Sequence, residues 1–450
     1  MNILVFCRKN LILYRDIINL AAKTLVTKAI GASGTLLLGL VLARLYGAEG
    51  VGTFMLGLSL IIGVGVLLRF GINDGILKFG GVAFYNHDGS MIKAILATTF
   101  FNVFFIGFLA CLVLLSFRVE LSLLVMDGGE LVDIFPPLLF CLPFYTYLFV
   151  LGSLYRAINE SPIAPVFETG FSSLFSALNI FIYESVFPGS TLLEATWIFA
   201  LSTFILFLLG VFTFLKKISI LNSLVSCEGD ALSSRFREFL RHLPDYFLIS
   251  LANYCSQWGI VLLGGFFLTA SSIGVFSTVN RVAFLINFIL MIFNGVLGPR
   301  FAVLCSARKY GAASDLYVFS SLVMFFIALL PAAVLIIFGK DILVFFGEEF
   351  VEGYYILVAL VISQLVNVGT GAVGSLLNMS GRQKVMRNLS LFTSFSSIAI
   401  AVVLFQLLGI WGLAFTTIYL LVVQNLAALF FANKVFGFCH KHQVSRNVSS

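Results

Sequence analysis

Long apolar runs recur along the whole chain and constrain its fold more than any other feature. Each run has about 20 residues or more, the length that an α-helix needs to cross a bilayer. A membrane β-barrel would instead show segments of about ten residues with alternating polarity. Hydrophobic residues make up 60% of the 450 positions and charged residues only 11%, a balance unsuited to a water-exposed surface. The sequence therefore predicts an all-α integral membrane protein.

The apolar runs number about twelve, and they fall into two sets of six. They cover residues 20–45, 51–79, 91–116, 131–156, 164–186, 192–215, 246–267, 273–298, 316–339, 353–378, 389–408 and 411–432. A polar stretch of about thirty residues separates the two sets. We therefore expect an N-terminal six-helix lobe over 1–215, a cytoplasmic linker over 216–245, and a C-terminal six-helix lobe with a short cytoplasmic tail over 246–450.

The two sets of spans resemble each other at a constant shift of about 222 residues. The matching segments are 52–54 with 274–276, 78–79 with 300–301, and 152–154 with 374–376. Because each half holds an even number of spans, both halves have the same orientation and are expected to be related by a parallel pseudo-twofold repeat. Bundles of this kind enclose a cleft and work by alternating access, so the repeat favours a carrier over a channel.

Lysine and arginine concentrate in alternate connections between the spans. The opposite connections hold little beyond Arg44, Arg118 and Lys340, and they carry acidic residues instead. Because basic loops stay on the cytoplasmic side, both termini are predicted to be cytoplasmic. The first residues also lack the apolar core and small-residue cleavage site of a removed signal peptide.

Three basic residues stand out by their depth inside the predicted spans, where a charge costs about 2.5 to 3.5 kcal/mol on insertion scales. Lys28 is about eight residues into the first span, Arg69 is deep in the second, and Arg281 is about eight residues into the eighth. Lys28 either reaches back to the cytoplasmic headgroups or lines a cavity. Together the three cations predict an anionic substrate.

The neighbours of these cations leave two interpretations open. Arg69 precedes a polar, glycine-broken stretch with Asn73 and Asp74, so it either pairs with Asp74 in a structural role or is presented, with Asn73, to a substrate phosphate or carboxylate. Arg281 adjoins Asn280 and has no acid within one helical turn, which favours a cavity-facing role.

Two acidic residues, Asp74 and Glu168, are candidates for coupling transport to Na⁺ or H⁺. Glu168 is about four residues beyond Ala164, so a position at the cytoplasmic interface is favoured for it. The cysteines form no CxxC pair, and no phosphate-binding loop, GxSxG or HExxH motif is present. We therefore expect no metal site, no cofactor and no enzymatic activity.

Two stretches carry a resemblance to a known family. Residues 36–61 resemble the opening signature of bacterial polysaccharide transporters, the O-antigen flippase family within the MATE-like superfamily. Residues 257–286 resemble the seventh and eighth spans of that family, in which an apolar run and a short turn precede a glycine, an aromatic residue and an arginine. These are Gly274, Phe276 and Arg281 in this chain.

The resemblance implies a flippase in the bacterial inner membrane that moves an undecaprenyl-diphosphate-linked oligosaccharide to the periplasmic leaflet, for O-antigen or other surface polysaccharide. Lys28, Arg69 and Arg281 would bind the diphosphate, since arginine and lysine supply charge-assisted hydrogen bonds. The expected partners are the lipid-linked oligosaccharide, membrane lipid, and a polysaccharide polymerase with its chain-length machinery. We expect a monomer and no nucleic acid.

Two alternatives stay open at this stage. A cation-coupled exporter of drugs or metabolites on the same fold would require acids in the cavity, where this chain offers bases. An integral membrane polysaccharide polymerase or glycosyltransferase would usually require a large periplasmic loop or catalytic acids at the interface. The external connections have at most about 17 residues, and the repeat favours transport.

Overall fold

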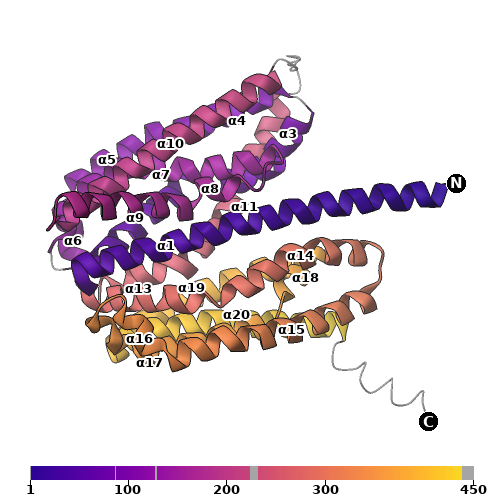
Figure 1. Cartoon of the computed structure of the whole chain (residues 1–450). Coiled ribbons are helices and arrows are strands. Elements are labelled where there is room, and N and C mark those ends of the chain that lie inside the picture. Colours follow the sequence, from indigo (N-terminus) through magenta and orange to yellow (C-terminus); the bar gives the residue numbers. More distant parts are fainter. Residues whose placement is uncertain (1, 87, 127–128, 223–231, 438–450) are drawn as a thin grey trace, which may run out of the picture. The chain divides into compact units, whose positions relative to one another are not determined.

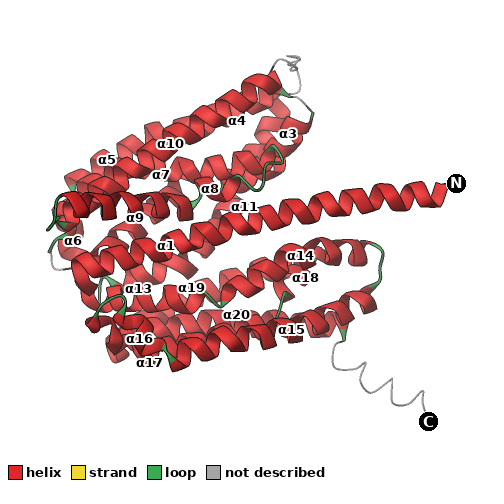
Figure 2. Cartoon of the chain, in the orientation of Figure 1, coloured by secondary structure: helices red, strands yellow, loops and turns green. Residues whose placement is uncertain are grey.

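The computed structural model describes residues 2–86, 88–126, 129–222 and 232–437, and every regular element within these ranges is helical (Figure 2). The helices of the first part of the chain are α1 (Asn2–Arg69), α2 (Ile72–Gly75), α3 (Gly81–Tyr85), α4 (Gly89–Phe100), α5 (Gly107–Ser116), α6 (Arg118–Met126), α7 (Leu131–Ala157), α8 (Ala164–Phe167), α9 (Thr169–Val186), α10 (Leu192–Asn222), α11 (Leu232–Tyr254) and α12 (Ile260–Gly264). They are followed by α13 (Ala270–Phe284), α14 (Asn287–Ser306), α15 (Tyr310–Ile337), α16 (Gly339–Val344), α17 (Tyr354–Gly369), α18 (Val373–Met379), α19 (Gln383–Leu408) and α20 (Ile410–Phe436).

Short segments of wider or tighter helix join some of these elements. Three are π-helical, Ile76–Gly80, Phe101–Ile106 and Cys255–Gly259, and Glu348–Gly353 forms a 3₁₀-helix. The chain divides into two compact units, Met1–Gly274 (unit 1) and Val275–Ser450 (unit 2). The predicted linker lies partly outside the described residues, as do the last residues of the C-terminal tail, and the predicted domain limits stay a prediction.

Ten described helical segments are long and apolar enough to cross a membrane. The first, Lys23–Arg69, has 47 residues, about twice the length that one crossing needs, and the non-helical Gly47 divides it. It therefore supplies the first two predicted spans. The 18-residue α9 and the 15-residue α13 lie in the fifth and eighth predicted spans. The chain is thus a multi-pass, all-α membrane protein, as predicted.

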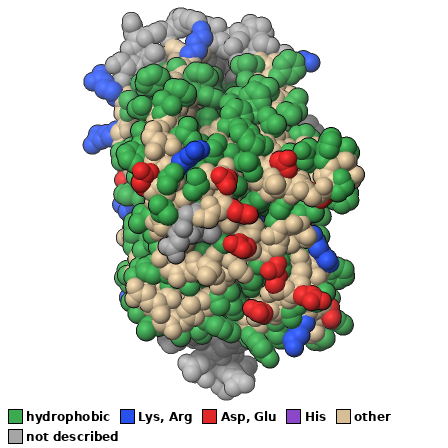
Figure 3. Space-filling view, turned by 90° about the vertical axis from the view of Figure 1, so that its left-hand side faces the viewer, with side chains coloured by type: hydrophobic (Ala, Val, Ile, Leu, Met, Phe, Trp, Pro, Cys, Tyr) green, Lys and Arg blue, Asp and Glu red, His purple; other side chains and the backbone are tan. Residues whose placement is uncertain are grey.

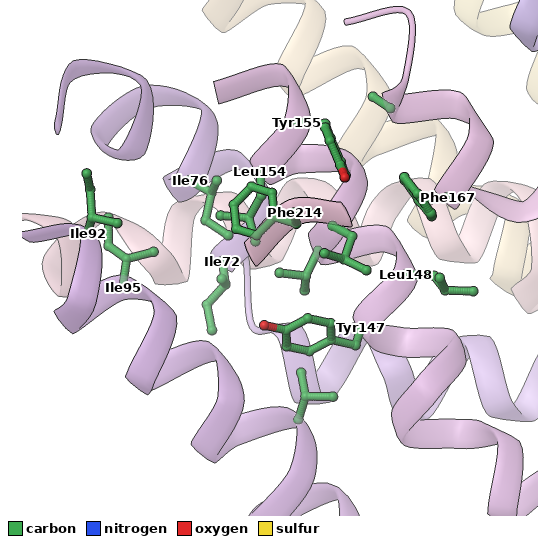
Figure 4. Close-up of a cluster of buried hydrophobic side chains, with 14 of the residues drawn as sticks. Ile72, Ile76, Ile92, Ile95, Tyr147, Leu148, Leu154, Tyr155, Phe167 and Phe214 are labelled. Atoms are coloured by element: carbon green, nitrogen blue, oxygen red, sulfur yellow. The ribbon is translucent and has the colours of Figure 1, made fainter. Parts of the chain in front are cut away.

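Helix α7 lies at the centre of unit 1, and its side chains are buried along almost its whole length. Together with residues of neighbouring helices it forms an apolar cluster (Figure 4), in which Tyr155 stacks on Phe167 with ring centroids 5.1 Å apart. The Tyr155 hydroxyl lies 2.9 Å from the hydroxyl of Thr213, so its polar end has a partner. This packing fixes one half of α7 beside α8 and α10. In the predicted orientation this is the cytoplasmic half.

Glycines let helices of unit 1 approach backbone to backbone. A Cβ atom on Gly34 of α1 would lie 2.4 Å from the carbonyl oxygen of Gly170 in α9. Helices in lipid associate through close packing of small residues because lipid tails are as apolar as the side chains they would displace. The large apolar side chains of α5, such as Phe108 and Leu109, are instead exposed, as expected for a surface that faces lipid.

A second glycine contact joins the two segments that the repeat predicts to be equivalent. A Cβ on Gly52 would lie 1.8 Å from the carbonyl oxygen of Ala270, and a Cβ on Gly274 would lie 1.9 Å from the carbonyl oxygen of Ala48. Positions 48 and 52 are separated from 270 and 274 by the same shift that relates the two predicted halves. The contact is therefore reciprocal, as expected where equivalent parts of a duplicated chain meet.

In unit 2 a network of buried amides holds α14, α17 and α20 together. The side-chain nitrogen of Asn367 donates to the oxygens of Asn287 at 3.1 Å and Gln364 at 3.2 Å, and Asn425 donates to Asn367 at 2.9 Å. Because a buried amide costs free energy unless it is hydrogen-bonded, these four side chains define how the three helices pack. Figure 1 shows α15, α17 and α20 running alongside one another in this unit.

Charges concentrate at the helix ends. Acidic side chains gather among hydrophobic ones in the view of Figure 3, and the connections on the predicted external side contain Glu130, Glu184, Glu348 and Glu349. The opposite ends of α14, α18 and α20 in unit 2 carry the arginines and lysines. This segregation is the pattern from which the cytoplasmic position of the termini was predicted.

Candidate functional site

The second membrane-crossing part of α1 ends at Arg69 because the backbone turns sharply there. Phe70 and Gly71 have positive φ angles of 41° and 77°, and α11 packs directly against the turn. A Cβ on Gly71 would lie 2.5 Å from the carbonyl oxygen of Leu243 and 2.6 Å from the amide nitrogen of Phe247. Phe70 stacks on Phe247 with centroids 4.6 Å apart. The close approach of α11 therefore requires glycine and fixes Arg69 at a helix end.

Arg69 is a buried cation, only 8% exposed. Its Nε–H donates to the carbonyl oxygen of Gly65 at 3.1 Å, and the guanidinium lies 4.3 Å from the ring centroid of Phe149 on α7. A cation–π contact that is shielded from water contributes about 2 kcal/mol of stabilisation. Within the part of the chain that the structure describes, Arg69 has no ion pair and its terminal nitrogens have no hydrogen-bond acceptor.

Three charged groups surround Arg69 at longer range. Asp74 on α2 and Glu168, between α8 and α9, both attract it electrostatically. Glu168 forms an ion pair with Arg156 at the end of α7. Asp74 is half-buried and is attracted by Arg156 and Arg69. The cluster thus holds two cations and two anions, of which one cation and one anion are paired directly with each other.

Two buried oxygen atoms near Arg69 lack a hydrogen-bond partner among the described residues. They are Oδ1 of Asn73 and Oγ1 of Thr146. Thr146 faces Gly65, since a Cβ on that glycine would lie 2.8 Å from its hydroxyl oxygen. Buried polar atoms normally have hydrogen-bond partners. These two oxygen atoms and the terminal nitrogens of Arg69 are therefore candidates for binding a polar ligand inside an otherwise apolar bundle.

In unit 2 the predicted residues Asn280 and Arg281 lie near the end of α13, and both are half-buried. Arg281 already has an interaction partner within the protein. The preceding turn carries Ser277 and Thr278, whose buried hydroxyls have no partner among the described residues. A helix face with a guanidinium and two unpartnered hydroxyls resembles the arrangement around Arg69 in its chemistry.

The structure brings only some of the predicted site residues together. Arg69, Asp74 and Glu168 belong to one cluster, with Asn73 beside it, whereas Lys28 lies exposed on α1. Sequence reasoning missed Arg156 because the residue follows the apolar part of its span. It also missed Phe149 and Thr146, which are isolated in the sequence. The spacing of Thr146 and Phe149 by three residues, on one face of α7, was the available signal.

The arrangement of helices and of buried polar groups defines a class of protein, a multi-pass α-helical membrane protein with ionisable groups inside its bundle. No protein-family model matches the chain, and no curated protein matches its sequence. Solved structures, in contrast, match its fold over nearly its whole length.

The inward-facing form of a multidrug resistance MATE family transporter of the MOP superfamily matches with a TM-score of 0.72 at 14% identity, covering 93% of this chain and 98% of that one. The lipid II flippase MurJ, in an inward closed conformation, matches with a TM-score of 0.67 at 16% identity and covers 92% and 87%. A MOP superfamily transporter from Pyrococcus furiosus matches with a TM-score of 0.58 at 14% identity and covers 94% and 96%. The chain therefore has the fold of MOP-superfamily transporters, which confirms the predicted MATE-like architecture.

Proposed function

We propose that this protein is a flippase of the bacterial inner membrane that carries an undecaprenyl-diphosphate-linked oligosaccharide from the cytoplasmic to the periplasmic leaflet. The product would feed the synthesis of O-antigen or another surface polysaccharide. The likeness of the fold to both exporters and a lipid II flippase supports a transporter of this general kind. The resemblance of residues 36–61 and 257–286 to polysaccharide transporters supports the substrate class.

The observation that carries the proposal is the buried guanidinium of Arg69. A cation inside the membrane is costly, and arginine is retained in such places where it recognises carboxylate or phosphate. The Phe149 ring and the Gly65 carbonyl fix the orientation of the side chain, while its terminal nitrogens remain available for the oxygens of a diphosphate. Asn73 and Thr146 supply further polar atoms for the sugar or phosphate.

Within unit 2, the face of α13 that carries Asn280 and Arg281 with Ser277 and Thr278 is a separate candidate for contact with the substrate. Its hydroxyls suit the hydroxyl-rich surface of an oligosaccharide, because each can donate and accept a hydrogen bond. Lys28 lies exposed on α1, and its proposed contact with the diphosphate stays part of the proposal.

The driving force is proposed to be a Na⁺ or H⁺ gradient acting through Asp74. Glu168 is less suited to this role, because its carboxylate is already engaged by Arg156. Asp74 has no ion pair among the described residues and lies within electrostatic reach of both arginines. Binding of a cation at Asp74 would weaken its attraction to Arg69 and so alter the site for the diphosphate.

The proposal is tested in a strain from which the chromosomal copy is deleted, complemented with wild-type protein or with Arg69→Ala. The variant is expected to lose surface glycan and to accumulate lipid-linked repeat units. A hydrogen bond to a charged group contributes about 1.5 to 3 kcal/mol, so substrate affinity should fall by roughly ten- to a hundredfold. Arg69→Lys, which keeps the charge without the planar fork, should restore part of the export.

The matched control is Lys93→Ala on α4, an exposed lysine away from the cluster. It should export glycan like the wild type. Membrane levels of all variants are compared by immunoblot, so that loss of transport is separated from loss of protein. Normal glycan in the deletion strain would refute the proposed function, and normal glycan with Arg69→Ala at normal level would remove Arg69 from the site.

A cation-coupled exporter is the second candidate. The fold of a MATE multidrug transporter matches 93% of the chain, and Asp74 provides a half-buried carboxylate inside the bundle. This alternative predicts that the deletion strain becomes sensitive to cationic drugs while its surface glycan stays normal. The flippase proposal predicts instead that the deletion strain loses surface glycan while its sensitivity to cationic drugs stays unchanged.

A further inference from the structure

We propose that a groove on unit 2 holds a stretch of the isoprenoid chain of the lipid-linked substrate. The inference rests on the proposed function, and it assigns a binding place for the substrate's tail within unit 2 alone. The groove has a volume of about 370 Å³. It lies among α15, α17 and α20, and its lining includes Tyr317, Ser321, Phe325, Gly369 and Leu429.

The groove lies beside a glycine-containing break at the end of α17. The helix ends at Gly369, and Gly371 has a φ of 67°, where a Cβ would lie 2.0 Å from the hydroxyl oxygen of Ser321. A Cβ on Gly369 would lie 3.1 Å from the Phe325 ring. The Tyr317 hydroxyl donates to the carbonyl oxygen of Thr370 at 2.6 Å. These glycines thus let the end of α17 pack closely against α15, and the tyrosine satisfies the backbone carbonyl that the break exposes.

The lining of the groove suits an apolar occupant. Its two hydroxyl groups are both engaged inside the protein, since Tyr317 donates to Thr370 and the Ser321 hydroxyl donates to the carbonyl oxygen of Tyr317 at 2.8 Å. Val318 and Leu322, at the rim of the groove, are exposed. Because α15 is long and apolar enough to cross a membrane and these rim side chains are apolar, we infer that the rim meets hydrocarbon and that a lipid chain enters the groove.

Basic residues at one end of the groove indicate an anionic headgroup. The start of α15 and the end of α20 lie together, because Tyr310 and Phe436 are in ring contact at 6.0 Å. Lys309 precedes that start and Lys434 lies in the last turn of α20, and both are exposed. At 1.5 Å per residue, Lys434 is about 7.5 Å along the helix from Leu429. A phosphate attached to a chain in the groove would therefore lie near lysine.

The neighbouring helix ends strengthen this charge. The described residues at the same ends of α14, α15, α18 and α19 include Arg300, Arg308, Arg382, Lys384 and Arg387. The acid nearest in sequence to this end of α15 is Asp315. A polyprenyl diphosphate has one chain and a doubly charged headgroup region, whereas a phospholipid has two chains that would compete for one small groove. One small groove beside a basic helix end therefore favours a polyprenyl diphosphate over a phospholipid.

The test uses the full-length protein in nanodiscs and an undecaprenyl diphosphate that carries a diazirine in its chain. Light-induced labelling should map to peptides of α15 and α20, and unlabelled undecaprenyl diphosphate should suppress it, whereas an equal mole fraction of phosphatidylglycerol should not. Leu429→Trp fills the groove and should reduce this labelling roughly tenfold. The neighbouring Phe430, 66% exposed and outside the groove, provides the matched control Phe430→Trp, which should label like the wild type.

Val318→Trp, at the rim, is a second variant that fills the groove from outside should Leu429→Trp fail to accumulate. Equal labelling of wild type and the filled variants, or equal suppression by phosphatidylglycerol, would overturn the groove proposal. Glycan export in the deletion strain is scored separately. If wild-type protein restores export while the label maps to other helices, the groove is wrong and the flippase stands; normal export without the protein refutes the flippase itself.

Discussion

Substitution of Gly52 by alanine is the sharpest test of the reciprocal contact between α1 and α13. The added Cβ would start 1.8 Å from the carbonyl oxygen of Ala270, and contacts under 3.0 Å essentially never occur for real Cβ atoms. The obstacle is helix backbone and cannot rotate away. The two helices must therefore separate until the distance grows from 1.8 Å to at least 3.0 Å.

Overpacking of a well-packed interior usually costs about 1 to 3 kcal/mol. We expect Gly52→Ala at the upper end of that range, because both partners are backbone. Gly274→Ala should cost about the same, because its Cβ would start 1.9 Å from the Ala48 carbonyl oxygen.

The assay is the thermal unfolding midpoint of purified protein in mild detergent, followed by intrinsic fluorescence. The control is Gly295→Ala in α14, where an added Cβ meets nothing within 4 Å. Alanine there should be neutral or stabilising by up to about 1 kcal/mol, through helix propensity. If Gly52→Ala unfolds at the same temperature as Gly295→Ala, the close contact does not exist. If Gly274→Ala is harmless while Gly52→Ala is not, the contact is not reciprocal.

Two further predictions concern single hydrogen-bonding groups. Burial raises the pKa of Asp88, but hydrogen bonds from the Ser90 hydroxyl and the Met91 N–H, together with the ion pair to Arg235, outweigh it, and the pKa is lowered. The capping of α4 by the Asp88 carboxylate is therefore fully stabilising above about pH 3.9, the pKa of an unfolded aspartate. This stabilisation is lost as the pH falls through the lower pKa that Asp88 has in the folded protein. Asp88→Ala should cost about 1 kcal/mol at pH 7 and progressively less as the pH falls below about 3.9, measured as unfolding midpoints; a cost independent of pH would contradict the role of the carboxylate. Tyr317→Phe should destabilise unit 2 by about 1 to 3 kcal/mol, because the Thr370 carbonyl loses its donor, and an unchanged midpoint would show that this carbonyl has another donor.

The sequence predicted the membrane class, most spans and the internal repeat, because these depend on periodic patterns that persist over many residues. Length alone distinguished helices from strands. The repeat placed Gly52 and Gly274 at equivalent positions, although their direct contact could not be foreseen, since it depends on how α1 and α13 cross. The kink at Gly47 also matched the expected division between the first two spans.

The site was predicted only in part, because its contacts join residues far apart in the chain. The depth of Arg69 in its span revealed a costly cation, but its stacking on Phe149 depends on the packing of α7 against α1. The pairing of Glu168 with Arg156 was missed for the same reason. The amide network around Asn367 and the groove beside Gly369 are made by three helices each, so no single stretch of sequence contains them.

The most direct test of the account is a flipping assay in proteoliposomes that contain the purified protein and a fluorescent undecaprenyl-diphosphate-linked oligosaccharide. Dithionite added outside bleaches only the label in the outer leaflet. We predict that wild-type protein lets nearly all of the label become accessible within the assay time, and that Arg69→Ala vesicles bleach to about half, like protein-free vesicles. Equal bleaching by wild-type and protein-free vesicles would contradict the flippase function, and wild-type rates from Arg69→Ala would contradict the role of its buried guanidinium.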